Sequence, residues 1–257
     1  MPSVQVGNIE VAYEVQGSGD PFMLVHGSTG GRAHWVEQAP VLAERFTVIT
    51  PEYAGGGEST TPDRPIEVDE LRDQMFAVAD EIGAQRFHLA GWSLGAVVVM
   101  AMAAAQPDRI RSLTIINGWA KSDARQKFTF DLWQRLLDDP ELFGRYALAD
   151  GLTVESFEAF GDGIEAMIPM IAGTIAPGSK LHAELDGRID IADRLGAITA
   201  PTLIVGGLQD RWVDIAHSRS MAEAIAGARI EELACGHLIP TEKAAELTAL
   251  LLEHADR

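Results

Sequence analysis

Residues 87 to 105 read Phe-His-Leu-Ala-Gly-Trp-Ser-Leu-Gly-Ala-Val-Val-Val-Met-Ala-Met-Ala-Ala-Ala, and this stretch decides the fold. Its first four residues form a short apolar run typical of a buried strand, and residues 94–105 form an almost wholly apolar helix that ends before a proline. The strand must therefore turn directly into the helix at Gly91-Trp92-Ser93-Leu94-Gly95. Such a turn exposes the central side chain at the carboxyl edge of a sheet.

Ser93 is the candidate nucleophile at this turn. We expect Gly91 and Gly95 to be required because a Cβ at either position would collide with neighbouring backbone. The amino terminus of the helix supplies partial positive charge and a free N–H at Leu94, which can face a developing oxyanion. The alternative is a serine that caps an ordinary helix.

Further short apolar runs predict the rest of a sheet. Alternating apolar residues around Gly7-Asn8 predict an opening hairpin of two antiparallel strands. Helical spacing over residues 68–82, and a last helix near the C-terminus, separate or follow the strands. Because strands alternate with helices, we predict an α/β fold with a mostly parallel sheet of about eight strands and helices on both faces. The remaining predicted strands are 21–25, 46–49, 87–90, 113–116, 202–205 and 229–233.

The alternation stops between Trp119 and Gly196, where short amphipathic helical pieces replace strands. One of these pieces spans residues 164–168, and we expect Pro169 to end it and residues 172–179 to form a loop. The chain is therefore predicted to have a discontinuous core, residues 1–118 and 197–257, with a helical cap, residues 119–196, inserted after the sixth strand.

A serine hydroxyl needs a base, and His237 is the best placed of the seven histidines. It follows the last predicted strand and precedes the final helix, so we expect it at the same sheet edge as Ser93. The alternative is a structural loop histidine. His34 is expected on a helix surface instead.

The base in turn needs a carboxylate that orients it. Asp210 follows the strand 202–205 through a short turn and is the preferred candidate. Asp214 and Asp123 remain alternatives, the first also explained as an acid in a first helical turn and the second as a solvated loop charge.

The order Ser93, Asp210, His237, with the nucleophile on a strand-to-helix turn and His26-Gly27-Ser28-Thr29-Gly30 after an earlier strand, resembles the α/β-hydrolase fold family over essentially the whole chain. The resemblance implies an oxyanion hole formed by the main-chain N–H groups of Ser28 and Leu94, and a mainly structural role for His26. It leaves open whether the Ser28 hydroxyl is a further donor to substrate or only shapes the turn.

The chain departs from the family in the segment after the strand 46–49. Many relatives have Asp-x-Arg-Gly-x-Gly-x-Ser there, whereas residues 52–59 read Glu-Tyr-Ala-Gly-Gly-Gly-Glu-Ser. The arginine is absent, and the three glycines predict a mobile loop.

Composition limits the partners. The 257 residues carry 38 Asp plus Glu against 20 Lys plus Arg, a formal net charge of −18. We expect this charge to repel nucleic acids and anionic membranes; the alternative is that it serves solubility alone and implies nothing about partners. Neither a signal peptide nor an 18-residue apolar span is evident, and the single cysteine, Cys235, suits a reducing compartment. We expect a cytoplasmic protein with a small-molecule substrate and no nucleic-acid or membrane partner, as a monomer or a homodimer.

Together these features predict a serine hydrolase that forms an acyl-enzyme on Ser93 and needs no cofactor or metal. We expect a small to medium apolar carboxylic ester or lactone as substrate, with thioesters next. The alternatives are hydrolysis of a carbon-carbon bond in a keto or enol acid, and a hydrolase-like receptor or scaffold without activity. The candidate substrate-binding residues are aromatic: Trp35, Trp92, Trp119, Phe130, Trp133 and Tyr146, with Phe128, Phe143, Phe157 and Phe160 as further residues of the cap.

Overall fold

A hydrogen-bonded sheet of eight strands forms the centre of the computed structural model, which describes all residues 1–257. The spatial order is β1-β2-β4-β3-β5-β6-β7-β8. The first two neighbouring pairs, β1–β2 and β2–β4, are antiparallel, and the other five pairs are parallel. This confirms the predicted mostly parallel sheet. The strands are β1 (Ser3–Val6), β2 (Ile9–Gly17), β3 (Asp20–Val25), β4 (Phe46–Pro51), β5 (Phe87–Trp92), β6 (Ile110–Ile116), β7 (Thr202–Gly207) and β8 (Arg229–Leu233).

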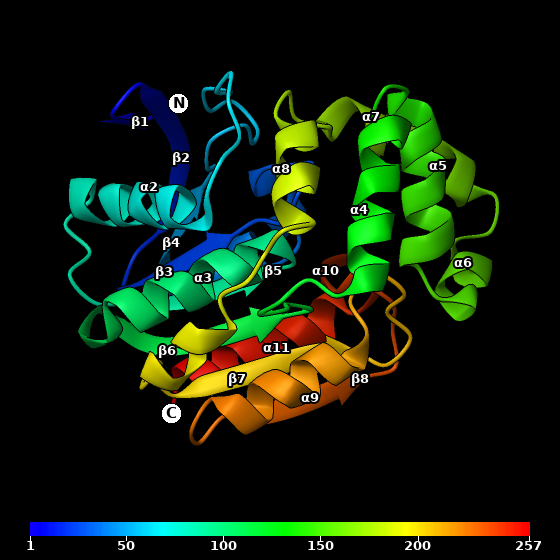
Figure 1. The fold of residues 1–257 in the computed structure, drawn as a ribbon. Coiled ribbons are helices and arrows are strands. Elements are labelled where there is room, and N and C mark those ends of the chain that lie inside the picture. Colours follow the sequence, from blue (N-terminus) through cyan, green and yellow to red (C-terminus); the bar gives the residue numbers. More distant parts are fainter.

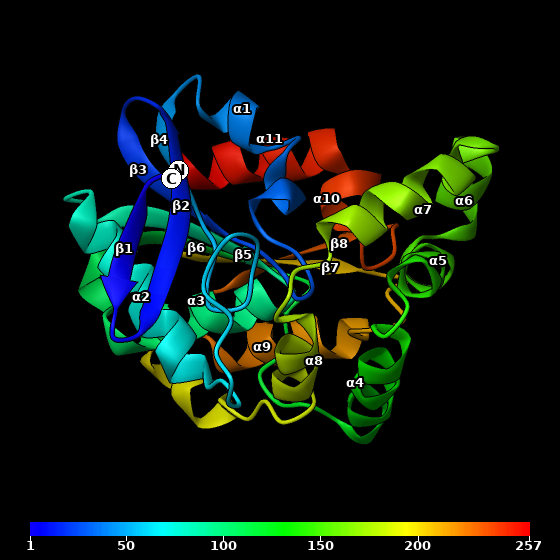
Figure 2. The ribbon, with the colours of Figure 1, turned by 90° about the horizontal axis from the view of Figure 1, so that it is seen from above.

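Helices cover both faces of the sheet, as predicted (Figure 2). One face carries α2 (Val68–Glu81), α3 (Leu94–Ala105) and α9 (Ile215–Ala224), and the other carries α1 (Ala39–Leu42) and α11 (Ala244–Ala255). The short helices η1 (Arg32–Trp35), η2 (Pro107–Arg109) and α10 (Ile239–Glu242) lie in the connections.

The apolar sequence of α3 is explained by its burial. Every residue from Leu94 to Ala103 is buried, because α3 packs on β5 and β6 while α2 and the 3₁₀ helix η3 (Ala192–Ala197) cover it. Full burial of a Val, Leu or Met side chain contributes about 1.5–3 kcal/mol each. The helix that begins at the strand-to-helix turn is therefore held firmly against the sheet.

Helices also fill the segment between β6 and β7, which we call the helical insertion, residues 119–196 (Figure 1). It contains α4 (Ala124–Leu136), α5 (Pro140–Gly151), α6 (Val154–Phe160), α7 (Gly163–Thr174), α8 (Ser179–Asp186) and then η3. Its buried aromatic residues belong to the same apolar cluster as α2 and α3, so the insertion packs on the core of the sheet.

The expected end of a helix at Pro169 is wrong, and the loop expected at residues 172–179 is shorter, spanning residues 175–178 between α7 and α8. Helix α7 continues through Pro169 to Thr174. Pro169 lies on the exposed side of α7, where water can satisfy the carbonyl group that loses its intrahelical donor.

The expectation of a mobile glycine-rich loop at residues 52–59 is not supported by its packing. The Glu52 side chain is buried and accepts hydrogen bonds from the N–H groups of Arg32 (3.0 Å) and Glu58 (2.9 Å). Arg32 also pairs with Glu52 at 3.0 Å. The Arg32 side chain on η1 therefore holds this segment in place. A Cβ at Gly57 would also collide with the Glu52 carboxylate, so the glycine is required by close packing.

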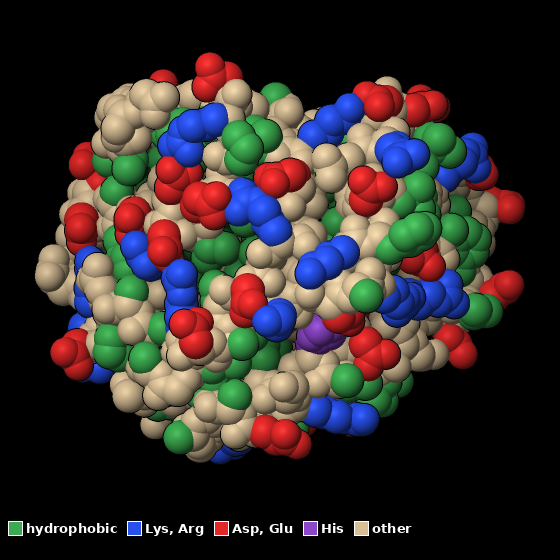
Figure 3. Space-filling model, in the orientation of Figure 1, with side chains coloured by type: hydrophobic (Ala, Val, Ile, Leu, Met, Phe, Trp, Pro, Cys, Tyr) green, Lys and Arg blue, Asp and Glu red, His purple; other side chains and the backbone are tan.

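The surface mixes charges of both signs. Asp and Glu side chains spread over the face shown, with Lys and Arg among them, and apolar side chains show over the helical insertion (Figure 3). No helix combines the length and apolarity needed to cross a membrane.

Candidate active site

The strand-to-helix turn holds Ser93 in a strained conformation. Its φ is 58° and its ψ is −123°, a combination that non-glycine residues rarely adopt. A Cβ on Gly91 would collide with the carbonyl of Gly95, and a Cβ on Gly95 would collide with the carbonyl of Val25. Both glycines are therefore needed for close packing at the turn, as the sequence indicates.

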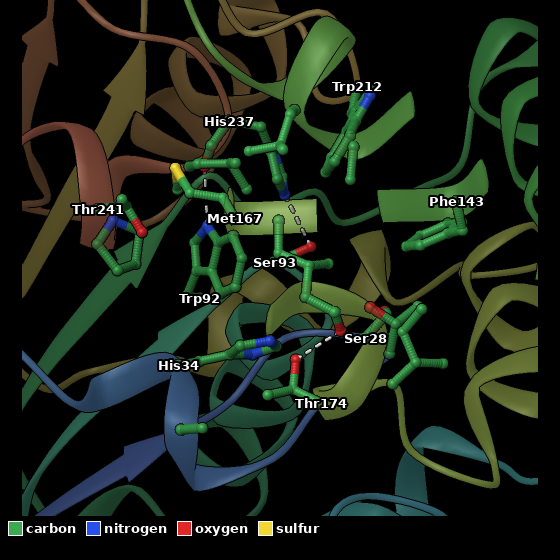
Figure 4. Close-up of a pocket in the computed structure, with 18 of the residues that line it drawn as sticks. Ser28, His34, Trp92, Ser93, Phe143, Met167, Thr174, Trp212, His237 and Thr241 are labelled. Carbon is green, nitrogen blue, oxygen red and sulfur yellow. Dashed lines mark hydrogen bonds between the residues drawn. The ribbon is translucent and has the colours of Figure 1, made fainter. Parts of the chain in front are cut away.

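Ser93, His237 and Asp210 lie in a hydrogen-bonded line. His237 Nδ1 is 2.7 Å from Asp210 Oδ2. His237 Nε2 is 3.0 Å from Ser93 Oγ, the contact drawn between these two residues in Figure 4. All three residues are buried, and each follows the carboxyl end of a parallel strand: β5, β8 and β7. With the Nδ1 proton donated to Asp210, Nε2 can accept the proton of the Ser93 hydroxyl.

The second oxygen of Asp210 fixes the carboxylate in place. Its Oδ1 accepts hydrogen bonds from the main-chain N–H groups of Trp212 (2.8 Å) and Val213 (2.9 Å). The two competing carboxylates have other partners: Asp214 caps α9, and Asp123 caps α4 and contacts His217 at 3.1 Å. Only Asp210, of the three, meets His237.

Two main-chain N–H groups are available beside the serine. Leu94 is the first residue of α3, so its N–H has no acceptor within the helix. Ser28 lies in the loop after β3, outside any helix or strand, and its N–H donates no main-chain hydrogen bond. The next residue, Thr29, has a φ of 66°, which bends this loop sharply.

A cavity of about 180 Å³ opens above Ser93 and His237. The volume is small beside the roughly 300–1,000 Å³ of pockets that take drug-sized ligands. Most of the lining is apolar, and no lysine or arginine contributes to it. In Figure 4 Met167 and Phe143, both from the helical insertion, lie on either side of Ser93. The lining residues include Trp92, Trp133, Phe143, Met167, Ile171 and Trp212.

Comparison with known proteins places this geometry in a family. A family model described as the alpha/beta hydrolase fold matches residues 20–244. The chain belongs to the α/β-hydrolase fold family. An enol-lactonase structure from Burkholderia xenovorans LB400 aligns with this α/β hydrolase at a TM-score of 0.89 and 22% identity, with 100% of both chains covered, which shows the same fold.

Two curated relatives are more similar in sequence. The chain is 33% identical over 256 residues to a pyrrolizixenacetamide deacetylase from Xenorhabdus hominickii, covering 98% of this chain and 96% of the relative. It is 32% identical over 244 residues to a putative carbamate hydrolase RutD from Azorhizobium caulinodans, covering 92% and 91%. Both relatives have names of hydrolases, and this α/β hydrolase is an enzyme of that broad class.

Of the six aromatic residues predicted to bind substrate, two line the cavity of this α/β hydrolase: Trp92 and Trp133. The other four do not line it. Trp35 packs in the apolar cluster between the sheet and α11. Trp119 and Phe130 stack on each other in the core, with ring centroids 5.6 Å apart. Tyr146 bonds to Asp150 at 3.1 Å. Composition alone could not separate aromatic residues that pack the core from those that face the cavity.

Several lining residues escaped the sequence prediction. Trp212 lies two residues after Asp210, and its ring contacts the His237 ring with centroids 4.8 Å apart. His34 lines the cavity and meets the Trp92 ring edge-on at 4.9 Å, so its expected place on a helix surface is wrong. Burial lowers the pKa of His34 to about 4, which keeps its ring neutral near pH 7.

Two further residues, His26 and Cys235, are buried near the site. His26 stacks on Tyr53 with ring centroids 3.9 Å apart, and its Nδ1 lies 2.7 Å from the Gly27 carbonyl. Burial raises the pKa of Cys235 to about 12, so this thiol stays protonated. Neither side chain lines the cavity.

Proposed function

We propose that this α/β hydrolase is a serine hydrolase that cleaves an ester-type or amide-type acyl bond of a small, largely apolar substrate. The observation that supports this most strongly is the line from Ser93 through His237 to Asp210, with distances of 3.0 and 2.7 Å, opening on an apolar cavity. Serine activation needs these three groups in this order.

In the proposed reaction Ser93 Oγ attacks the substrate carbonyl carbon while its proton passes to His237 Nε2. The resulting oxyanion accepts hydrogen bonds from the N–H groups of Ser28 and Leu94. The carbon-oxygen or carbon-nitrogen bond then breaks, and His237 gives its proton to the leaving group. Water, deprotonated by His237, attacks the acyl-enzyme, which releases the carboxylic acid and restores Ser93.

The substrate class follows from the cavity and the relatives together. The apolar lining favours an uncharged acyl group, and esters and lactones were predicted on the sequence alone. A deacetylase and a carbamate hydrolase as relatives extend the proposal to amides and carbamates. Carbon-carbon hydrolysis of a keto or enol acid has less support, since no lysine or arginine in the lining can bind the substrate carboxylate.

The test compares wild type with Ser93→Ala on matched short-chain nitrophenyl esters, a lactone, an N-acetyl arylamide and an aryl carbamate. We expect wild type to hydrolyse at least one of them and Ser93→Ala to lose at least about 10³-fold in kcat. A fluorophosphonate probe is expected to label wild type only. Ser220→Ala, which removes an exposed hydroxyl on α9, serves as the matched control and should behave as wild type.

Near wild-type turnover or probe labelling in Ser93→Ala would overturn the proposed nucleophile. A wild-type enzyme that the probe does not label, and that turns over none of the panel, would instead support the inactive scaffold.

A further inference from the structure

A fully buried carboxyl group lies directly behind the loop that carries Ser28. Asp186, the last residue of α8, is 0% exposed, and its Oδ2 accepts a hydrogen bond of 2.6 Å from Ser28 Oγ. Its Oδ1 has no hydrogen-bond partner. The contact joins residues 158 positions apart, one in the helical insertion and one beside the nucleophile.

No cation compensates this carboxyl group. His182 lies one turn before it on α8, Tyr53 in the segment after β4 is close enough for Asp186 to raise its pKa, and His26 in the loop after β3 stacks on Tyr53. Burial lowers the pKa of His182 to about 4 and that of His26 well below its usual range, and burial together with Asp186 raises the pKa of Tyr53. All three are uncharged near pH 7. Burial likewise raises the pKa of Asp186 to about 8, so the acid is mostly protonated there.

Other contacts hold residues 176–186 in place, and one of them reaches the same loop. The N–H of Ala176 donates to the carbonyl of Thr29 at 2.9 Å, next to Ser28. His182 bonds to the carbonyl of Ala54 at 2.9 Å, and Ser122 Oγ donates to the Asp186 carbonyl at 2.6 Å. The sharply bent Ser28-Thr29 turn is therefore held from behind by residues 176–186.

We propose that Asp186 is a positioning residue for the reaction, which through Ser28 Oγ holds the Ser28 N–H toward the oxyanion that forms on Ser93. This role rests on the proposed function. The 2.6 Å contact fixes the side chain of the residue whose main-chain N–H is the proposed donor. It also engages the Ser28 hydroxyl, so this group is bound to Asp186 and is not a free donor to substrate.

The charge of Asp186 also affects the oxyanion, because Asp186 is bonded to the residue that carries one of the proposed donors. An oxyanion is stabilised by donors in a dry site, and a carboxylate charge behind one of these donors would oppose the developing negative charge. The uncharged acid accepts the Ser28 hydrogen bond without adding that charge. We therefore expect kcat to fall as the pH rises through about 8, where Asp186 ionises.

The experiment measures kcat and KM of wild type, Asp186→Ala, Asp186→Asn and Ser28→Ala from pH 6 to 10 on the best substrate of the panel. Asp186→Ala and Ser28→Ala should each lower kcat at pH 7 by about 10–100-fold with KM changed less than about threefold, because the loss affects the transition state. Asp186→Asn keeps an acceptor oxygen, so it should recover most of this kcat and lack the fall near pH 8. Asp193→Ala, which removes an exposed acid on η3 of the helical insertion, is the matched control.

The outcomes separate the two proposals. If hydrolysis persists in Ser93→Ala, the proposed function fails and this role fails with it. If hydrolysis depends on Ser93 while Asp186→Ala keeps wild-type kcat, or lowers kcat and Asp186→Asn lowers it equally, the positioning role alone is overturned. Should Asp186→Ala fail to fold by circular dichroism, the pH profile of Asp186→Asn decides: an unchanged alkaline fall contradicts the role, and its loss supports it.

Discussion

One wall of the cavity consists of strand ends, whereas the other consists of side chains from the helical insertion. On the strand side the main chain determines the geometry: Ser93 has a φ of 58°, and Gly91 and Gly95 leave no room for a Cβ. On the insertion side, Phe143 and Met167 reach the cavity from helices α5 and α7, which are held by packing between helices.

The two walls of the cavity should therefore differ in how well they tolerate substitutions. A side chain fixed by backbone strain and a hydrogen-bonded line cannot shift without losing the reaction geometry, so substitutions on the strand side should affect kcat or folding. A packed apolar wall can rearrange around a smaller side chain, so substitutions on the insertion side should mainly affect binding. The following variants test this contrast.

The largest effect is expected on the strand side for Asp210→Asn. The amide keeps nearly the same size, but it can no longer hold His237 in the tautomer that accepts the serine proton, and kcat should fall by roughly 10³–10⁴-fold. Asp214→Asn is the control, because that residue caps α9 and should leave kcat within about twofold of wild type. Equal effects of the two substitutions on kcat would rule out Asp210 as the partner of His237.

The same Gly→Ala change should have opposite effects in the two regions. At Gly95 the new methyl group collides with the carbonyls of Val25 and His26, and the free energy of unfolding should fall by about 3 kcal/mol or more. At Gly173 in α7 nothing lies within 4 Å of the new Cβ, and alanine should stabilise the helix by roughly 0.5–1 kcal/mol. Urea denaturation measures both values, and a similar loss at the two positions would contradict the contrast.

The strand side was also the part that could be predicted from sequence. Ser93, Asp210 and His237 each follow an apolar run, and parallel strands bring their carboxyl ends to one edge. The structure brings all three together. Sequence alone cannot distinguish an aromatic residue that packs in the core, such as Trp35 or Trp119, from one that lines a pocket. Asp186 had no local signal, since its partner Ser28 is 158 positions away.

A third prediction concerns His182, which joins the insertion to the sheet core. Its Nε2 donates to the Ala54 carbonyl, its Nδ1 is buried without a partner, and burial lowers its pKa to about 4. The unfolded chain binds a proton at about pH 6.5, so this histidine stabilises the fold fully above that pH and the contribution is lost as the pH falls toward 4.

At pH 5 this lost contribution amounts to about 2 kcal/mol, from 1.5 pH units at about 1.36 kcal/mol each. His182→Gln keeps a donor but does not titrate, so its free energy of unfolding should fall less than that of wild type between pH 7 and pH 5. His217→Gln, at an exposed hydrogen bond to Asp123, is the comparison variant. A wild-type pH dependence in His182→Gln would show that this group does not titrate as proposed.

The smallest effect is expected on the insertion wall. Met167 lines the cavity, whereas Met170 on the same helix is 69% exposed, so the pair separates contact with substrate from a general effect on α7. Met167→Ala removes about 1 kcal/mol of apolar contact with a bound acyl chain, which corresponds to a rise in KM of about fivefold with kcat nearly unchanged. Met170→Ala should change neither. The rise in KM should be larger for a butyryl ester than for an acetyl ester, because only the longer chain reaches the wall. An equal loss of kcat for both esters would mean that the Met167 side chain affects the chemistry, and that the two walls of the cavity are not distinct in function.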